Sequence, residues 1–364
     1  MNTDAKNLFT ATEIHGLTLR NRFAVAPMTR VSAAEDGTPT ETMARYYERF
    51  ARGGFGLLIT EGIYTDQTFA QGYIHQPGIT DEAQAQAWRP VVDAVHRHGA
   101  RIFAQLMHAG AISQGNRFRD TSVGPSAVQP KGNQMEFYYG KGAYPMPAAI
   151  TEEQVAEAIE GFASSAARAV AAGFDGIEIH GANGYLIDQF LTDYANQRSD
   201  RWGGDTRQRT AFVRAVFEAV RAKVEVPVGV RISQGKVNDF THKWAGREQD
   251  AEAIFGTLAE AGVSYIHVTE HKAWEPAFEG GQDSLVALAR RYAPHVPLIA
   301  NGGVGDAARA QEVLSAGADF VALGKAALAN PDFPNRIQAA HDVAAFDPAI
   351  LGPIANIKPI ELAA

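Results

Sequence analysis

Short apolar runs alternate along this chain with longer segments in which apolar residues recur at helical spacing. Most of the runs are largely apolar and often β-branched, as strands buried on both faces of a parallel sheet should be. We predict eight strands, at Phe23–Pro27, Gly56–Thr60, Ala100–Gln105, Gly176–Ile179, Pro227–Ser233, Tyr265–Thr269, Pro297–Asn301 and Phe320–Gly324. Helices are predicted between them, at roughly Thr40–Arg52, Glu82–His98, Thr206–Val224, Gln249–Ala261, Ser284–Tyr292, Ala307–Ala316 and Lys325–Ala339.

The clearest helix start is Thr151-Glu-Glu-Gln154, a capping-box pattern that apolar residues follow at helical spacing. With this helix, eight strand–helix units can be counted, and their natural closure is a (β/α)8 TIM barrel. A doubly wound open sheet is the alternative, but it would normally carry a Gly-x-Gly-x-x-Gly turn after its first strand, which this chain lacks. We therefore expect an α/β fold, a single barrel domain over residues 1–364, with a short N-terminal hairpin.

The segment Asp120–Pro147 interrupts this rhythm between the third strand and the third helix. It is rich in Gly, Pro and Tyr, and includes Phe137-Tyr-Tyr-Gly140. We predict a long loop with a small hairpin over the barrel mouth, where the loops of such barrels form active sites. The tail from Phe346 onward carries little pattern.

Composition narrows the classes of function. The chain has 364 residues, with 33 basic and 41 acidic side chains and a formal net charge of -8, which argues against nucleic acid or an anionic membrane as a partner. Cysteine is absent, which excludes disulfides, thiolate catalysis and iron–sulfur clusters. No apolar stretch approaches about 18 residues, and the N-terminus lacks the apolar core of a signal peptide. We expect a cytoplasmic protein without a membrane span.

The segment that follows the fourth predicted strand carries the most chemical information. Two hydrogen-bond donors, His180 and Asn183, are followed by a phenol, Tyr185. Just past a strand end, the spacing of His180 and Asn183 can place both donors on one side of a tight turn, while a phenol can give up a proton. A purely structural role for His180 stays open. A metal site is disfavoured, because the chain has no His-Glu-x-x-His and only His108 and His180 stand at predicted strand ends.

Two further strand ends indicate a phosphate site. Asn301-Gly302-Gly303 and Gly324-Lys325 follow the seventh and eighth predicted strands, where phosphate sites recur in this fold. Glycines let the backbone approach an anion, and a helix that begins at Lys325 would direct its N–H groups toward it. The alternative is that both are ordinary turns.

Arg231 stands inside the otherwise apolar run Val228–Ser233. A buried cation is costly unless it meets an anion or a polar ligand. Arg231 is therefore a candidate ligand-binding residue, and a structural ion pair with Glu178 or Asp283 is the alternative.

The segment His180-Gly-Ala-Asn-Gly-Tyr-Leu-Ile-Asp-Gln-Phe-Leu191, with Asn196-Gln-Arg-Ser-Asp-Arg-Trp-Gly-Gly204 after it, resembles the signature of the Old Yellow Enzyme family of flavin ene-reductases. The likeness extends over about residues 7 to 340 in the same order and spacing. It includes the segments Leu17–Arg22, Ala26–Thr29, Ile59–Gly62, Gln105–Gly110, Val230–Ser233 and Leu323–Pro334.

The resemblance implies that the barrel binds FMN non-covalently across its mouth. In the family pattern Thr29 bonds the flavin O4, Gln105 binds the pyrimidine edge, and Arg231 lies near N1, where a fixed cation stabilises the charge of the reduced flavin. The implied FMN-binding residues are Pro27, Met28, Thr29, Gly62, Gln105, His180, Arg231, Asn301, Gly302, Gly303, Gly324 and Lys325.

The resemblance also implies a substrate and a reaction. His180 and Asn183 would bind the carbonyl or nitro oxygen of an activated alkene, and Tyr185 would protonate its α-carbon after hydride transfer to the β-carbon. Tyr73 matches a pocket-lining, substrate-binding tyrosine of the family. NADH or NADPH would be the reductant in a ping-pong cycle, and the enzyme would be a monomer or homodimer.

Two departures and two alternatives accompany this interpretation. Lys325 stands where many relatives have Arg, so the phosphate would meet a point charge in place of a planar fork. Thr29 stands where one bacterial branch of the family has Cys. One alternative function is a phosphate-binding barrel aldolase or isomerase (a lyase or isomerase class) with Lys325 as an amine nucleophile. The other is a flavin-binding protein without turnover.

Overall fold

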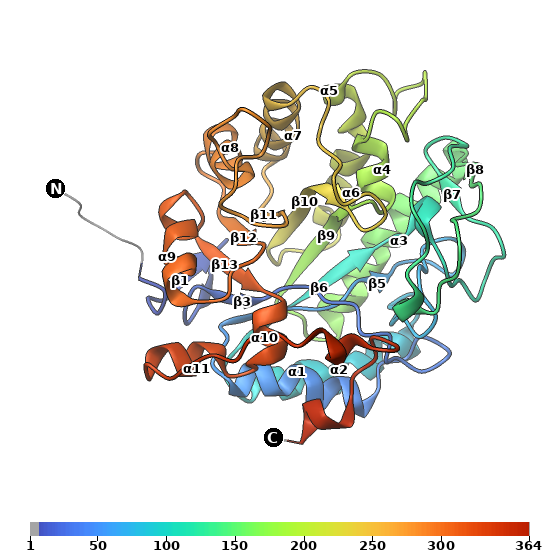
Figure 1. The fold of residues 1–364 in the computed structure, drawn as a ribbon. Helices are drawn as coiled ribbons and strands as arrows, with labels where there is room; N and C mark the ends of the chain where they lie inside the picture. Colours follow the sequence, from blue (N-terminus) through green and yellow to red (C-terminus); the bar gives the residue numbers. More distant parts are fainter. Residues whose placement is uncertain (1–6, 364) are drawn as a thin grey trace.

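The computed structural model describes residues 7–363, and their strands close into a parallel barrel with helices outside it (Figure 1). Each strand pairs with the next in chain order, and the last pairs with the first through Val321–Leu323 and Phe23–Val25. The predicted TIM barrel is thus confirmed. Its strands are β3 (Phe23–Val25), β4 (Leu57–Ile59), β6 (Arg101–Met107), β9 (Gly176–Asn183), β10 (Val228–Lys236), β11 (Tyr265–Thr269), β12 (Leu298–Asn301) and β13 (Phe320–Leu323).

The helices between the strands bury their apolar faces against the barrel. The capping box at Thr151 is present, because Gln154 N–H donates to the Thr151 hydroxyl and Thr151 N–H donates to the Gln154 side chain. The main helices are α1 (Glu41–Arg52), α2 (Glu82–His96), α3 (Glu152–Ala171), α6 (Ala211–Arg221), α7 (Glu248–Ala261), α8 (Leu285–Tyr292) and α9 (Ala307–Ser315). Among the described residues, no helix is long and apolar enough to cross a membrane.

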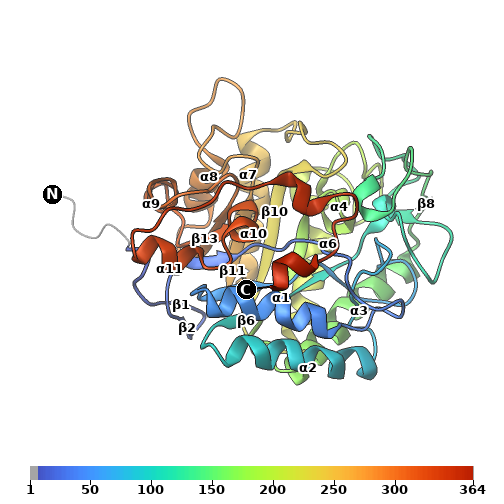
Figure 2. The same ribbon diagram turned by 60° about the horizontal axis from the view of Figure 1, so that its bottom comes forward.

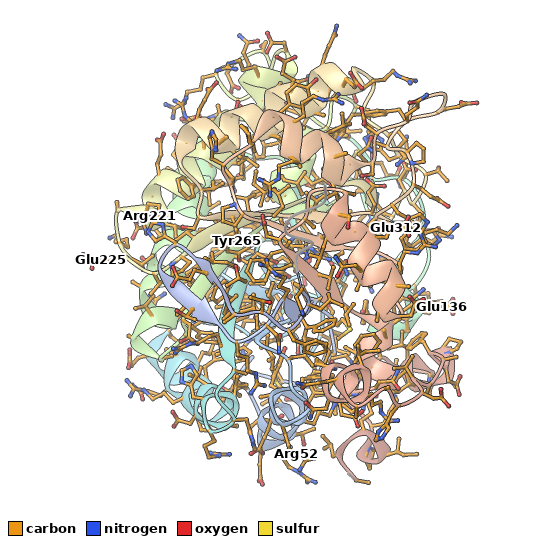
Figure 3. The ribbon with its side chains drawn as sticks, turned by 90° about the vertical axis from the view of Figure 1, so that its left-hand side faces the viewer. Arg52, Glu136, Arg221, Glu225, Tyr265 and Glu312 are labelled. Carbon is orange, nitrogen blue, oxygen red and sulfur yellow. The ribbon has the colours of Figure 1, made fainter. Side chains whose placement is uncertain are left out.

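The expected N-terminal hairpin is present as β1 (Thr12–Ile14) and β2 (Leu17–Leu19), which pair antiparallel. Its buried Ile14 and Leu19 pack into one apolar cluster with side chains at the starts of barrel strands, Phe103 and Tyr265 among them. Figure 3 labels Tyr265 among the side chains that fill this interior. The hairpin therefore closes the amino-terminal end of the barrel and leaves the carboxyl end open for a site.

Two predicted helices are interrupted in the structure. The segment 206–224 forms α5 (Thr206–Arg209) and α6, which meet at Thr210. The segment 325–339 forms α10 (Lys325–Ala329) and α11 (Phe333–Gln338). Pro331 explains the second break, because it disfavours a helical conformation at Asn330 and lacks an N–H to continue the helix.

β9 extends beyond the predicted end at Ile179. It runs through Asn183, because β10 also continues to Lys236 and pairs Lys236 with Asn183 after a bulge. His180 therefore lies within a strand, and the turn follows at Asn183 and Gly184, directly before α4 (Leu186–Leu191).

The long segment after β6 is more irregular than predicted. The short strands β7 (Val123–Gly124) and β8 (Ala148–Ala149) pair in parallel, so they do not form a hairpin. Its short helical turns are η1 (Gly110–Ile112) and η2 (Glu136–Tyr138), and the hairpin pattern reduces to an isolated antiparallel bridge between Asn133 and Ala143.

The C-terminal tail is ordered in spite of its patternless sequence. It contains η3 (Pro348–Leu351) and η4 (Pro359–Leu362), and η4 lies against α1 (Figure 2). Arg30, fully buried next to Thr29, donates to both carboxylate oxygens of Glu361, and Arg49 also bonds this carboxylate. A buried ion cluster thus attaches the tail to the loop after β3.

Candidate functional site

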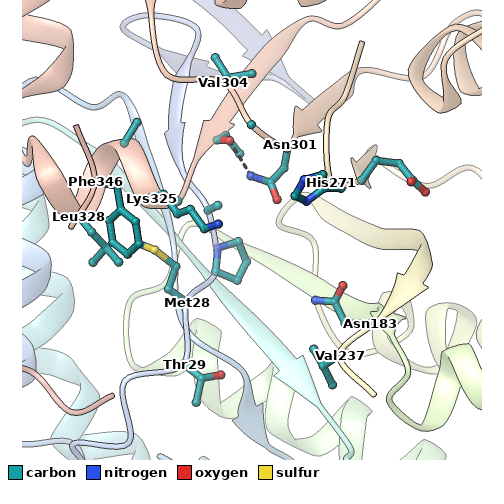
Figure 4. Close-up of a pocket in the computed structure, with 18 of the residues that line it drawn as sticks. Met28, Thr29, Asn183, Val237, His271, Asn301, Val304, Lys325, Leu328 and Phe346 are labelled. Carbon is teal, nitrogen blue, oxygen red and sulfur yellow. Dashed lines mark hydrogen bonds between the residues drawn. The ribbon is translucent and has the colours of Figure 1, made fainter. Parts of the chain in front are cut away.

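A cavity of about 630 Å³ opens at the carboxyl end of the barrel strands (Figure 4). All of the site residues expected from the sequence line it except Tyr73. The ones it brings together are Pro27, Met28, Thr29, Gly62, Gln105, His180, Asn183, Tyr185, Arg231, Asn301, Gly302, Gly303, Gly324 and Lys325. They come from seven different strand ends, which only barrel closure places around one space.

His180 is a neutral hydrogen-bond donor in this cavity. Burial, with Arg231 and His267 adding to it, holds the pKa of His180 well below its usual range. The Ala182 N–H donates to His180 Nδ1 at 3.3 Å, so Nδ1 is the unprotonated nitrogen of the neutral ring. The proton therefore resides on Nε2, which remains available to donate to a ligand oxygen.

Asn183 is held in a left-handed conformation, with φ of 63°, that places its amide beside the cavity (Figure 4). Its N–H donates to the Ser233 hydroxyl at 2.8 Å, and its carbonyl accepts from Val237 N–H at 3.0 Å. Asn tolerates this conformation better than most residues. The backbone around the second donor is thus fixed by β10.

A buried ion pair supports the turn that follows Asn183. Asp188 accepts the Gly184 N–H at 2.6 Å, and Lys236 Nζ lies 2.8 Å from each oxygen of this carboxylate. Both side chains are almost inaccessible to solvent. The sequence analysis missed this pair, whose only signal was the Asp inside the motif, 48 residues from the lysine.

Arg231 has an unused donor at the floor of the cavity. Its Nη2 donates to Asn301 Oδ1 at 3.1 Å and to Thr269 Oγ1 at 3.3 Å. Its buried Nε has no hydrogen-bond partner within residues 7–363. The alternative ion pairs are not observed over this range, since Asp283 pairs with Arg291 and the Glu178 carboxylate contacts other side chains. Arg231 is therefore able to donate a hydrogen bond from Nε to a ligand.

Glu178 forms a buried network beneath the cavity that sequence reasoning did not find. It accepts hydrogen bonds from Gln105 Nε2 at 2.8 Å and from His267 Nδ1 at 2.9 Å. Burial by itself raises the pKa of this carboxyl, but His267, Arg231 and the hydrogen bond from Gln105 outweigh it and hold the pKa of Glu178 below its ordinary value. One N–H of the Gln105 amide is used on Glu178, which leaves its carbonyl oxygen and its second N–H for a ligand.

The opposite end of the cavity suits an anion. Gly302 and Gly303 have φ of 138° and 68°, and a Cβ on Gly302 would lie 2.1 Å from the Glu270 carbonyl oxygen. Lys325 projects toward the same space and makes no ion pair with any of the described residues (Figure 4). Because α10 is so short, we expect the Lys325 charge and the glycine backbone to matter more than the helix dipole.

Some lining residues were not predicted individually. Tyr138, from the long segment after β6, lines the cavity and donates its hydroxyl to the Thr29 carbonyl at 3.1 Å, so this segment does shape the pocket. Phe346 and Leu351 come from the tail, where the sequence offered no signal.

Tyr73 lies behind the cavity wall. It is absent from the lining, and its hydroxyl oxygen is 2.5 Å from that of Tyr185. The sequence-based assignment of Tyr73 to substrate binding stays a prediction, while its observed neighbour is the expected proton donor.

A model of the NADH:flavin oxidoreductase / NADH oxidase family matches residues 7–342. The solved structure of an old yellow enzyme homologue from Zymomonas mobilis aligns over 98% of both chains, with 31% identity and a TM-score of 0.87. The chain belongs to the Old Yellow Enzyme family. Among its relatives, a chanoclavine-I aldehyde reductase of Penicillium roqueforti is 36% identical over 91% of this chain and 89% of its own length. A probable flavin mononucleotide-dependent alkene reductase of Leishmania infantum is 34% identical over 92% and 91%.

As a member of the Old Yellow Enzyme family, the protein is an oxidoreductase that uses FMN and a nicotinamide cofactor. The cavity itself fits FMN. Its volume lies in the range of about 300 to 1,000 Å³ of small-molecule sites. The unpartnered Arg231 Nε suits the electron-rich pyrimidine edge, and the space at Gly302, Gly303 and Lys325 suits a phosphate.

Glu61, directly before the cavity residue Gly62, yields a prediction on stability. Burial raises the pKa of its carboxyl to about 7, in spite of hydrogen bonds from Arg30 and Val31 N–H. A pKa above that of the unfolded chain means that the folded protein binds the extra proton. Its stability should therefore fall as pH rises from about 4.5 to 7, by about 3 kcal/mol from this group.

Urea unfolding of the native protein and Glu61→Gln at several pH values measures this contribution. The difference between the two should shift in favour of Glu61→Gln as pH rises through this range. Glu157→Gln, at an exposed position on α3, is the matched control and should show no such shift. A constant difference across the range would contradict the raised pKa.

Proposed function

We propose that this protein is an ene-reductase, which reduces the C=C bond of α,β-unsaturated carbonyl or nitro compounds with electrons from NADH or NADPH. When bound, FMN would supply the hydride-transfer chemistry that links the nicotinamide to the alkene. The observation that carries the proposal is the convergence of His180, Asn183 and Tyr185 on one cavity beside Arg231.

His180 and Asn183 would hold the substrate oxygen. A neutral His180 donates through Nε2, and the Asn183 amide donates from the adjacent turn. Both hydrogen bonds strengthen as the oxygen acquires negative charge, so they stabilise the transition state more than the ground state. Because the strands and the Asp188–Lys236 pair fix these groups, little reorganisation is needed.

Tyr185 would deliver a proton to the α-carbon. Burial raises its pKa to about 12, although the Tyr73 hydroxyl and Arg231 each lower it, so Tyr185 is fully protonated at neutral pH. A protonated phenol that lines the cavity next to the oxygen-binding pair suits a general acid.

The names of the relatives support this reaction class. They include an alkene reductase, an aldehyde reductase, 12-oxophytodienoate reductases and morphinone reductase. We further propose that the whole chain acts as one catalytic domain, as a monomer or homodimer in the cytoplasm, without a nucleic-acid or membrane partner. The net charge of -8 supports the last point.

Anaerobic mixing experiments test the function. The purified protein should show flavin absorbance, lose it on addition of NADH or NADPH, and regain it on addition of 2-cyclohexenone. A protein that binds no flavin would point to the lyase or isomerase alternative at Lys325. Flavin that NAD(P)H and enones fail to cycle would favour a binding protein without turnover. Reduction rates with each nicotinamide also determine the preferred reductant.

A further inference from the structure

Tyr73 and Tyr185 form a hydrogen-bonded pair of phenols. Their hydroxyl oxygens are 2.5 Å apart, and their rings meet edge to face with centroids 6.5 Å apart. Tyr73 is 1% exposed and Tyr185 4% exposed. Over residues 7–363, neither hydroxyl has another hydrogen-bond partner. Each phenol thus depends on the other for its hydrogen bond.

Tyr73 is placed by a loop that Gln76 ties together through hydrogen bonds. The loop follows β5 (Ile63–Tyr64), and Gln76 Oε1 accepts the N–H groups of Gly72 and Tyr73 at 2.8 and 3.3 Å. The Gln76 amide donates in turn to the Gly62 carbonyl at 2.7 Å. Because Gly62 lines the cavity, the position of Tyr73 is tied to the same strand end as the site.

Only Tyr185 of the two phenols reaches the cavity. We propose that Tyr73 is a positioning residue that donates its hydrogen bond to Tyr185 and thereby makes Tyr185 a stronger acid toward the substrate. This inference rests on the proposed ene-reductase function. In the proton transfer, the O–H bond of Tyr185 breaks as a C–H bond forms at the α-carbon. The Tyr185 phenolate keeps the hydrogen bond from Tyr73 until a solvent proton restores the phenol.

The surroundings set the direction of this hydrogen bond during proton transfer. Burial raises the pKa of both phenols, but it raises that of Tyr73 well above the usual range and that of Tyr185 only to about 12. Arg231 favours a negative charge on Tyr185, and Tyr73 has no comparable cation. The pair therefore loses its proton from Tyr185, and Tyr73 remains the donor.

A titration tests the inference without turnover. A fluorinated tyrosine at position 185, whose phenol ionises nearer neutrality, is followed by ¹⁹F NMR in the FMN-loaded protein. Tyr73→Phe should raise the pKa of this phenol by about 1 to 2, the effect of one hydrogen bond to a charged group. Tyr144→Phe is the matched control. Tyr144 belongs to the same apolar cluster, but its hydroxyl contacts Gln114 at 3.5 Å and not Tyr185. Its removal should leave the pKa of the phenol at position 185 unchanged.

Half-reaction kinetics test the consequence. Tyr73→Phe should slow oxidation of the reduced enzyme by 2-cyclohexenone about 3- to 10-fold and leave reduction by NAD(P)H unchanged, since only the oxidation by the enone uses the acid. In a Tyr185→Phe background the same substitution should have no further effect, because its route is through Tyr185.

An unchanged pKa at position 185, or equal slowing by Tyr73→Phe with and without Tyr185, would overturn the role of Tyr73. These outcomes differ from failure of the proposed function, in which the native protein itself would not be oxidised by enones. The NMR titration reports on the phenol pair in either case.

Discussion

Tyr185→Phe is expected to slow oxidation of the reduced enzyme by 2-cyclohexenone about 10²- to 10⁴-fold, the usual contribution of a general acid. Within residues 7–363, Tyr185 is the only phenol that both lines the cavity and meets the His180 ring edge to face, with ring centroids 4.7 Å apart. Reduction by NAD(P)H should remain nearly native, because this step needs no proton from Tyr185. Stopped-flow absorbance separates the two half-reactions.

Tyr138→Phe serves as a comparison for this result. Tyr138 also lines the cavity, but its hydroxyl donates to the Thr29 carbonyl, so its loss should not affect proton delivery selectively. A 2-nitroalkene offers a second check. The α-carbon of its product is acidic, so hydride transfer can come first and the α-carbon can take its proton later from solvent. If Tyr185→Phe slowed both half-reactions equally, the assignment of the proton donor would be wrong.

The double substitution of His180→Ala with Asn183→Ala should nearly abolish binding of phenols, which mimic the enolate oxygen of the substrate. Two hydrogen bonds to a charged oxygen are lost, each contributing about 1.5 to 3 kcal/mol, so the Kd for p-chlorophenol should rise about 10²- to 10⁴-fold. Titration by the perturbed flavin spectrum measures this Kd.

The left-handed backbone at position 183 provides a control for the double substitution. Alanine is strained at φ of 63°, whereas glycine is not. Asn183→Gly removes the same amide as Asn183→Ala, so the two variants should bind phenol equally weakly but differ in melting temperature. Retention of tight phenol binding by the double variant would refute the oxygen-binding role of His180 and Asn183.

The barrel could be predicted because its information is local. Buried parallel strands appear as short apolar runs, and the capping box at Thr151 marks the start of the helix that follows it. The helix break at Pro331 was missed, because helical spacing on both sides of the proline led to one predicted helix over Lys325–Ala339. By contrast, β9 extends to Asn183 because Asn183 pairs with Lys236 after a bulge in β10. No local sequence pattern predicts this bulge.

The candidate site divides in the same way. His180, Asn183 and Tyr185 lie within six positions of one another, and the glycines of the anion end adjoin strand ends, so their grouping followed once the barrel was assumed. The contribution of the C-terminal tail to the site could not be predicted, because the tail is held there by the ion pair of Glu361 with Arg30, 331 positions away in the sequence. The same holds for Glu178, which joins Gln105 to His267 beneath the cavity.

The sequence by itself determined the fold class, the family and most of the candidate residues that the cavity brings together, because each depends on the periodicity of one element or on a contiguous motif. Only the tertiary structure decided how those residues are prepared for chemistry. It directs the Ala182 N–H at Nδ1 of His180, leaves Nε of Arg231 without a hydrogen-bond partner within residues 7–363, and joins Tyr73 to Tyr185 across 112 positions. Such contacts depend on where loops return after the barrel closes, and the spacing of residues along the chain does not encode that geometry.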